Sequence, residues 1–225
     1  MDRTTKLDAL LLVSERLVSA GAVDLDARVE HCPDWAVRDL LIHIGMVQRF
    51  WTGVVSRRLT DPDDITRPTP PGDEIDVVGW CRQQTTELHS ALSDVQESDT
   101  IWTWHEPDQT IGFVLTRQVN EAVVHCFDAC NAVGVDSSIE PELAELGLME
   151  FVDVFAKHLR DHAEPVPVAL APTDSEWRGT LFSETDGQAP IVYADRASTL
   201  LLALWGRATP PDPRISAAIA CIDLD

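Results

Sequence analysis

The spacing of the apolar residues constrains the fold of this chain most, because they recur at intervals of three and four through most of the first 160 residues. This spacing gathers them into one stripe on an α-helix, and such a stripe must be buried against another element. Asp34, which follows Pro33, is a plausible N-cap for the second of these helices. The pattern predicts an up-and-down helical bundle with helices over residues 4–20, 35–58, 76–92, 111–133 and 143–162.

The pattern changes at Pro165-Val166-Pro167. Short strand-like runs follow over residues 166–171, 176–182 and 190–193, and then come a helix over 197–207 and a last segment over 215–225. We therefore expect a mainly α chain with two domains. The first is a helical bundle over residues 1–163, and the second is a small α+β domain over residues 164–225.

Composition narrows the classes of function. The chain has 225 residues and a formal net charge of -21 at pH 7, so it would repel phosphate backbones and anionic lipid, and we expect neither nucleic acid nor membrane partners. Its five cysteines are odd in number and form no C-x-x-C pair, which favours a reducing, cytoplasmic location. No apolar run approaches the roughly 20 residues that span a bilayer. We expect a monomer or a homodimer.

Three residues form a candidate metal site. Glu121 and His125 are four apart on a predicted helix and therefore project from the same side, one turn apart. His43 lies on the apolar stripe of the second helix, which turns it toward the interior of the bundle. Two imidazoles and one carboxylate are the ligand set of a catalytic zinc site that leaves a fourth position open.

The residues alone leave another interpretation open. A histidine in an apolar stripe, such as His43, is more often a satisfied core residue than a ligand. On the fourth helix Arg117, Glu121, His125 and Asp128 lie opposite the main apolar stripe, which is typical of a solvated face. Apolar residues flank that polar side, however, and a helix that is apolar most of the way round tends to be buried.

Several segments, in this order along the chain, resemble the mycothiol-dependent maleylpyruvate isomerase family. They are residues 32–45 (CPDWAVRDLLIHIG), 121–129 (EAVVHCFDA), 150–155 (EFVDVF) and 200–207 (LLLALWGR). The resemblance implies a DinB-like four-helix bundle with a small α+β domain after it. It also implies that His43, Glu121 and His125 hold zinc or another divalent metal. Cys126 and Phe127 depart from the Arg-Trp that many relatives carry after the second histidine.

The resemblance further implies an enzyme, either an isomerase or an S-transferase. Mycothiol would be its thiol cosubstrate, activated as a thiolate for attack on an electrophilic small molecule. Arg207, in the late Trp-Gly-Arg segment, is the best candidate to hold a substrate carboxylate, with Arg117 and Asn120 as candidates to hold the cofactor. Asp128 could orient a ligand. A metal-dependent hydrolase and a non-catalytic metal-binding or stress-response protein of the same fold are the alternatives.

Overall fold

The chain divides into two compact units, Met1–Ser137 and Ser138–Asp225. The computed structural model describes residues 1–72, 74–182 and 189–224. Its mainly α, two-domain architecture confirms the predicted fold class. The division falls earlier than the expected boundary after residue 163, because the fifth helix packs against elements of the second unit.

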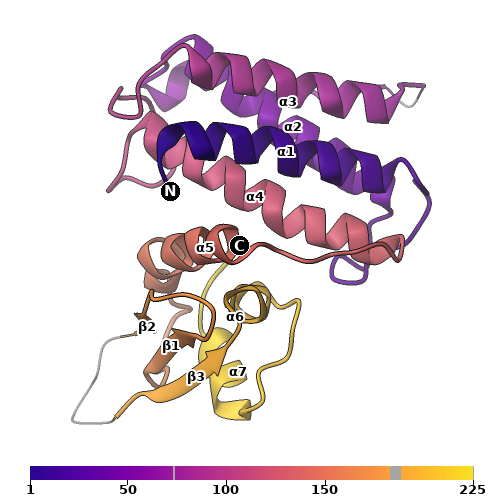
Figure 1. Cartoon of the computed structure of the whole chain (residues 1–225). Coiled ribbons are helices and arrows are strands. Elements are labelled where there is room, and N and C mark those ends of the chain that lie inside the picture. The colour runs from indigo at the N-terminus through magenta and orange to yellow at the C-terminus, as the bar shows by residue number, and fades with distance from the viewer. Residues whose placement is uncertain (73, 183–188, 225) are drawn as a thin grey trace. The chain divides into compact units, whose positions relative to one another are not determined.

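The first unit is built from four long helices, drawn in indigo to pink in Figure 1. Each lies within a few residues of its predicted range, and a short 3-10 turn, η1 (Pro62–Asp64), lies between the second and the third. No helix among the described residues is both long and apolar enough to cross a membrane. The helices are α1 (Arg3–Gly21), α2 (Val37–Ser56), α3 (Val77–Ser93) and α4 (Ile111–Ala132).

The helices of the bundle do not alternate strictly in direction. Arg3, at the start of α1, donates to the carbonyl of Leu92 at the end of α3 at 2.8 Å, so α1 and α3 are antiparallel. Arg38, near the start of α2, donates to the carbonyl of Ile75, just before α3, at 3.5 Å, so α2 and α3 run in the same direction. Lys6, near the start of α1, donates to the hydroxyl of Thr116, near the start of α4, at 3.3 Å, so α1 and α4 run in the same direction and the order is up-down-down-up. Residues 57–76 can make this return along a helix of about 30 Å, since extended chain covers about 3.3 Å per residue.

Helix α2 begins at Val37, two residues later than predicted, and Asp34 is not its N-cap. The backbone N–H of Ala36 instead donates to the carboxylate of Asp39 at 2.9 Å, so the first turn is held by a side chain within the helix. The preceding residues form a turn in which Trp35 N–H donates to the Cys32 carbonyl at 2.8 Å. This turn fixes the position of Trp35 just outside the helix.

Close packing of α2 on α3 depends on Gly45. A Cβ atom added there would lie 2.2 Å from the indole ring of Trp80, a distance that no real Cβ contact shows. Gly45 thus allows the ring of α3 to rest directly on the backbone of α2. Gly45 and His43 belong to the same helix, so the packing of Trp80 on Gly45 helps to set the position of that histidine.

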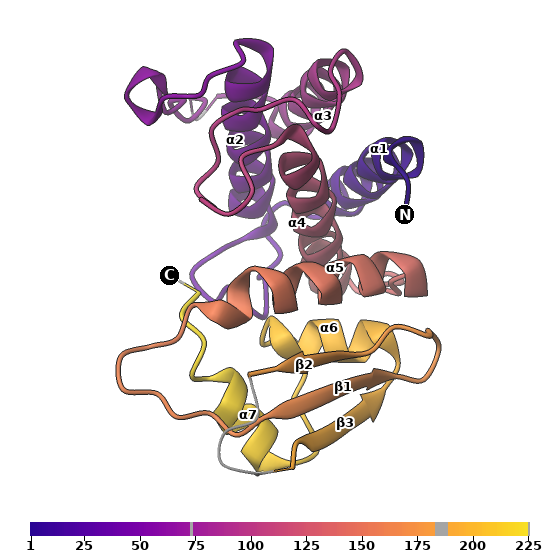
Figure 2. The same ribbon diagram turned by 90° about the vertical axis from the view of Figure 1, so that its left-hand side faces the viewer.

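The second unit contains a three-stranded sheet with strand order β2-β1-β3. Figure 2 shows the three strands side by side in this order. Strand β1 (Val168–Pro172) pairs antiparallel with β2 (Gly179–Leu181) and parallel with β3 (Ile191–Asp195). Helix α6 (Ala197–Leu204) packs on β1 and β3, and α5 (Pro141–Asp153) packs on α6. The remaining elements are the 3-10 turn η2 (Phe155–Lys157) and helix α7 (Pro213–Ile219). The fifth helix ends at Asp153, well before the predicted residue 162.

Candidate metal centre

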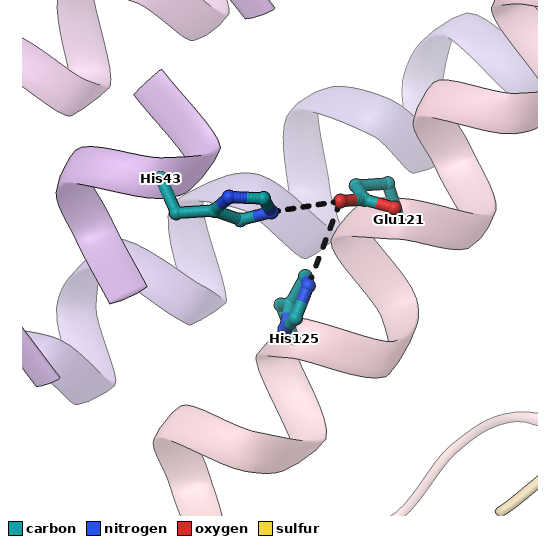
Figure 3. Close-up of side chains that lie close together, drawn as sticks. All are labelled: His43, Glu121 and His125. Atoms are coloured by element: carbon teal, nitrogen blue, oxygen red, sulfur yellow. Dashed lines mark hydrogen bonds and ion pairs between the residues drawn. The ribbon is translucent and has the colours of Figure 1, made fainter. Parts of the chain in front are cut away.

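The three predicted ligands converge within the first unit (Figure 3). His43 lies in the second turn of α2, and Glu121 and His125 lie one turn apart in the middle of α4. Glu121 Oε1 lies 3.1 Å from Nε2 of His43 and 3.5 Å from Nε2 of His125. One potential ligand atom from each of the three residues lies within 4.8 Å of the other two.

The polar side of α4 is not a solvated face. The side chains of His43, Glu121 and His125 keep only 32%, 17% and 13% of their exposure, and Asp128 is 1% exposed. Arg117 is buried as well. The side chain of His43 bridges from α2 to the carboxylate on α4, so this polar side faces a neighbouring helix.

Asp128 orients His125. Its carboxylate oxygen Oδ2 accepts from Nδ1 of His125 at 3.0 Å, one turn further along α4. The other ring nitrogen, Nε2, faces Glu121 and lies 3.5 Å from its Oε1. A carboxylate behind a histidine in this way fixes its tautomer and its ring orientation, as in the carboxylate–histidine–zinc arrangement of metalloproteins.

Arg117 holds the other oxygen of Glu121. Its Nη2 donates to Oε2, while Oε1 faces the two imidazoles. Arg117 and Glu121 are four residues apart on α4, a spacing at which helical side chains meet. The i,i+4 spacing of an arginine and a glutamate in the sequence could have suggested this pair. It did not indicate that the pair would be buried.

Electrostatics keep this cluster charged. Burial by itself would raise the pKa of Glu121, but the Arg117 guanidinium and the bonds from His125 and His43 outweigh it and hold that pKa well below its usual range. Burial would lower the pKa of His125, but its bonds to Asp128 and Glu121 raise it to about 9. In the metal-free protein, His125 therefore carries a proton at neutral pH that a metal ion must displace.

The donor set fits a divalent metal of the zinc type. Ligand atoms around a tetrahedral ion with bonds of about 2.0–2.1 Å lie roughly 3.3 Å from one another. The two distances from Glu121 Oε1 to the imidazole nitrogens, 3.1 Å and 3.5 Å, bracket that value. The separations from Glu121 to the two imidazoles therefore suit an ion of this kind.

Trp35 is a neighbour of this centre that the sequence did not single out. Its ring centroid lies 5.0 Å from that of His43 and 6.4 Å from that of His125. In the sequence, a tryptophan just before a helix carries no signal for a site. Its place depends on the turn that precedes α2. The indole thus lies closer to the ring of His43 than to that of His125.

Two other residues expected at the site, Asn120 and Arg207, lie in different units of the chain. Asn120 precedes Glu121, but its side chain leaves α4 about 100° around the helix axis. It is buried, and neither its Oδ1 nor its Nδ2 has a hydrogen-bond partner among the described residues. Arg207 belongs to the second unit, where its Nη1 donates to the carbonyl of Trp205 at 2.7 Å, just past the end of α6.

The fold and the site define a helical-bundle protein with a candidate His/Glu/His metal centre between two of its helices. The family model described as the mycothiol maleylpyruvate isomerase N-terminal domain matches residues 10–130, more than half of the chain. The chain belongs to this family.

Solved structures and curated proteins give two further comparisons. A crystal structure of the mycothiol-dependent maleylpyruvate isomerase is 12% identical, with a TM-score of 0.67 over 93% of this chain and 91% of that one. A histidine-to-alanine mutant of that isomerase, also 12% identical, gives a TM-score of 0.65 over 92% and 91%. At this identity the likeness establishes the fold. A comparison with curated proteins finds no match.

Proposed function

We propose that this protein is a metal-dependent enzyme that uses a low-molecular-weight thiol, mycothiol, to attack an electrophilic small molecule. The product is either an isomer or an S-conjugate. The convergence of His43, Glu121 and His125 on one point, in a chain of this family, carries the proposal. The use of a small-molecule thiol agrees with a reducing, cytoplasmic location.

Each residue of the centre has a distinct part in the proposal. His43 and His125 would bind a divalent ion, zinc by preference, through Nε2, and Glu121 would bind it through Oε1. When bound, the ion lowers the pKa of a thiol that reaches it, so that the thiol is held as a thiolate at neutral pH. Asp128 holds His125 in the tautomer that binding needs. The five cysteines all lie in described parts of the chain and none of them supplies a further ligand atom to this centre, so the thiol would come from a separate molecule.

Both kinds of product follow from addition of the thiolate to an activated double bond. The sulfur forms a bond to one carbon of an activated double bond, and the electron pair of that double bond moves onto the activating carbonyl. Rotation about the resulting single bond and loss of the thiolate return an isomer and regenerate the thiol. A proton taken up from solvent before that loss leaves a stable thioether, which is the product of a transferase.

Cations and amides would hold the reactants. Arg207 is proposed to pair with a substrate carboxylate, since a planar guanidinium can make two parallel bonds to it. Arg117 and Asn120 are proposed to contact polar groups of the thiol. Oδ1 and Nδ2 of Asn120 have no hydrogen-bond partner within the part of the chain that the structure describes, and this supports its role, because a buried amide without a partner is costly and a bound ligand would relieve that cost.

The test is turnover by the zinc-loaded protein with a panel of activated alkenes, maleylpyruvate among them, with and without mycothiol. We expect isomerised or thiol-conjugated product, identified by mass spectrometry, only when the thiol is present. His43→Ala and His125→Ala should lose both bound zinc and activity. His89→Ala, which replaces a histidine of α3, should keep both. Full zinc occupancy in the first two variants, or equal turnover without thiol, would refute the proposal, and the latter would favour a hydrolase.

A further inference from the structure

We infer that Arg117 is a positioning residue that makes Glu121 a one-oxygen ligand and so keeps one coordination position of the proposed metal centre open. The inference rests on that centre. The identity of the three ligand residues does not decide whether Glu121 binds through one oxygen or through both.

The two oxygens of Glu121 have different neighbours. Oε1 faces the interior of the site, 3.1 Å from His43 Nε2 and 3.5 Å from His125 Nε2. Oε2 faces away and accepts from Nη2 of Arg117. Only Oε1 is therefore directed at the point that the two imidazoles share. A metal ion at that point would leave the bond between Arg117 and Glu121 intact.

The surroundings make this arrangement hard to change. The side chains of Arg117 and Glu121 keep 10% and 17% of their exposure, so solvent screens their pairing weakly. Their bond is charge-assisted, which makes it stronger than a bond between neutral groups. A two-oxygen contact to an ion would require Oε2 to turn away from the guanidinium and leave a buried cation with one bond fewer. Arg117 thus opposes the rotation that would bring both oxygens to the ion.

A Glu121 that binds through one oxygen keeps the number of protein ligands to the ion at three. Two imidazole nitrogens and one carboxylate oxygen supply three ligands, and a catalytic zinc site needs a fourth position for a reactant. A carboxylate that bound through both oxygens would occupy that position or raise the coordination number. By holding Oε2 away from the ion, Arg117 therefore leaves the fourth position open for an external thiol.

A matched arginine elsewhere in the bundle serves as a control. Arg82 on α3 also pairs with a glutamate, Glu15 on α1, at 2.7 Å and 2.8 Å, but that pair is exposed and lies away from the metal centre. Arg82→Met removes an arginine–glutamate pair from the same bundle. It should leave the metal site unchanged.

The experiment uses the full-length protein loaded with cobalt(II), whose visible absorption is strong in four-coordinate sites and weaker at higher coordination numbers. Wild type and Arg82→Met should show the strong bands. Arg117→Met should bind cobalt at the same stoichiometry with bands weakened severalfold. Arg117→Lys, which keeps the charge but not the planar fork, should lie between them. X-ray absorption at the cobalt edge should count more oxygen ligands in Arg117→Met than in wild type.

The outcomes separate this inference from the proposed function. A wild-type spectrum in both Arg117 variants would overturn the inference, and circular dichroism would show that they are folded. If the wild-type cobalt spectrum does not respond to mycothiol, the thiol-dependent function fails. The role of Arg117 is still decided by the thiol-free spectra. Absence of cobalt binding by the wild-type protein would overturn both.

Discussion

Replacement of Asp128 by asparagine should change both the strength and the pH dependence of metal binding. Asp128 is buried, and its carboxylate accepts from Nδ1 of His125 at 3.0 Å. Asparagine has nearly the same size and keeps one oxygen acceptor, but it lacks the negative charge. The change therefore removes the electrostatic support of His125 with little effect on packing.

Two effects with opposite signs follow. Loss of the carboxylate makes the imidazole a weaker and less firmly oriented ligand, which typically costs 10- to 100-fold in metal affinity, or about 1.4–2.8 kcal/mol. The same loss lowers the pKa of His125 from its raised value of about 9, because the bond to Asp128 is the largest of the contributions that raise it. A lower pKa weakens the competition between the proton and the metal, which partly restores affinity near neutral pH.

The pH dependence separates these effects. With a pKa of about 9, only about one wild-type molecule in a hundred has a neutral His125 at pH 7, since the two units of difference count tenfold each. The apparent zinc affinity of wild type should rise about tenfold per pH unit up to about pH 9. For Asp128→Asn the rise should stop at a lower pH. The variant should bind 10- to 100-fold more weakly at pH 9.5 and less markedly so at pH 7.

The assay is competition for zinc with a chromophoric chelator between pH 6 and 9.5, together with an NMR titration of the His125 ring in the metal-free protein. Asp94→Asn, an exposed substitution at the end of α3, should behave as wild type. In the metal-free protein the raised pKa of His125 stabilises the fold fully below about pH 6.5, and this contribution disappears as the pH rises through about 9. Identical zinc affinity curves for wild type and Asp128→Asn would refute the reasoning.

Two further substitutions test the bundle and the second unit. Gly45→Ala should lower the free energy of unfolding by about 1–3 kcal/mol, because its Cβ would lie 2.2 Å from the Trp80 ring, and an unchanged Tm would contradict this. Arg207→Met should keep its Tm within a few degrees, since the bond to the Trp205 carbonyl caps a helix end and contributes under about 1 kcal/mol. Its kcat/KM should fall roughly ten- to a hundredfold if Arg207 holds a substrate carboxylate. A markedly lower Tm with unchanged activity per folded molecule would make Arg207 a structural residue.

The helices could be predicted because their pattern is local. Apolar spacing at three and four placed all four bundle helices within a few residues of their observed ranges. The side-by-side position of Glu121 and His125 also follows from spacing alone, because residues four apart on a helix share a face. The apolar stripe of α2 only permitted a contact between His43 and that pair, and the family resemblance favoured it, since no local rule sets which faces of two helices meet.

The contacts that give the candidate site its chemistry depend on tertiary structure. Whether Arg117, Glu121 and Asp128 were solvated or buried was open in the sequence. The packing of α4 decided it, because burial depends on what covers a helix face and not on the face itself. Burial then makes the bonds of Arg117 and Asp128 strong enough to orient Glu121 and His125.

The sequence by itself determined the helical class of this protein, the switch to strands after Pro165 and three residues able to share a metal ion. Tertiary structure alone decided that α2 and α3 run parallel, that Trp35 lies beside His43 and that the fifth helix belongs to the second unit. The physical reason is the range of the interactions. Periodicity and caps act over one or two turns, whereas helix direction, ring contacts and unit boundaries depend on residues far apart in the chain.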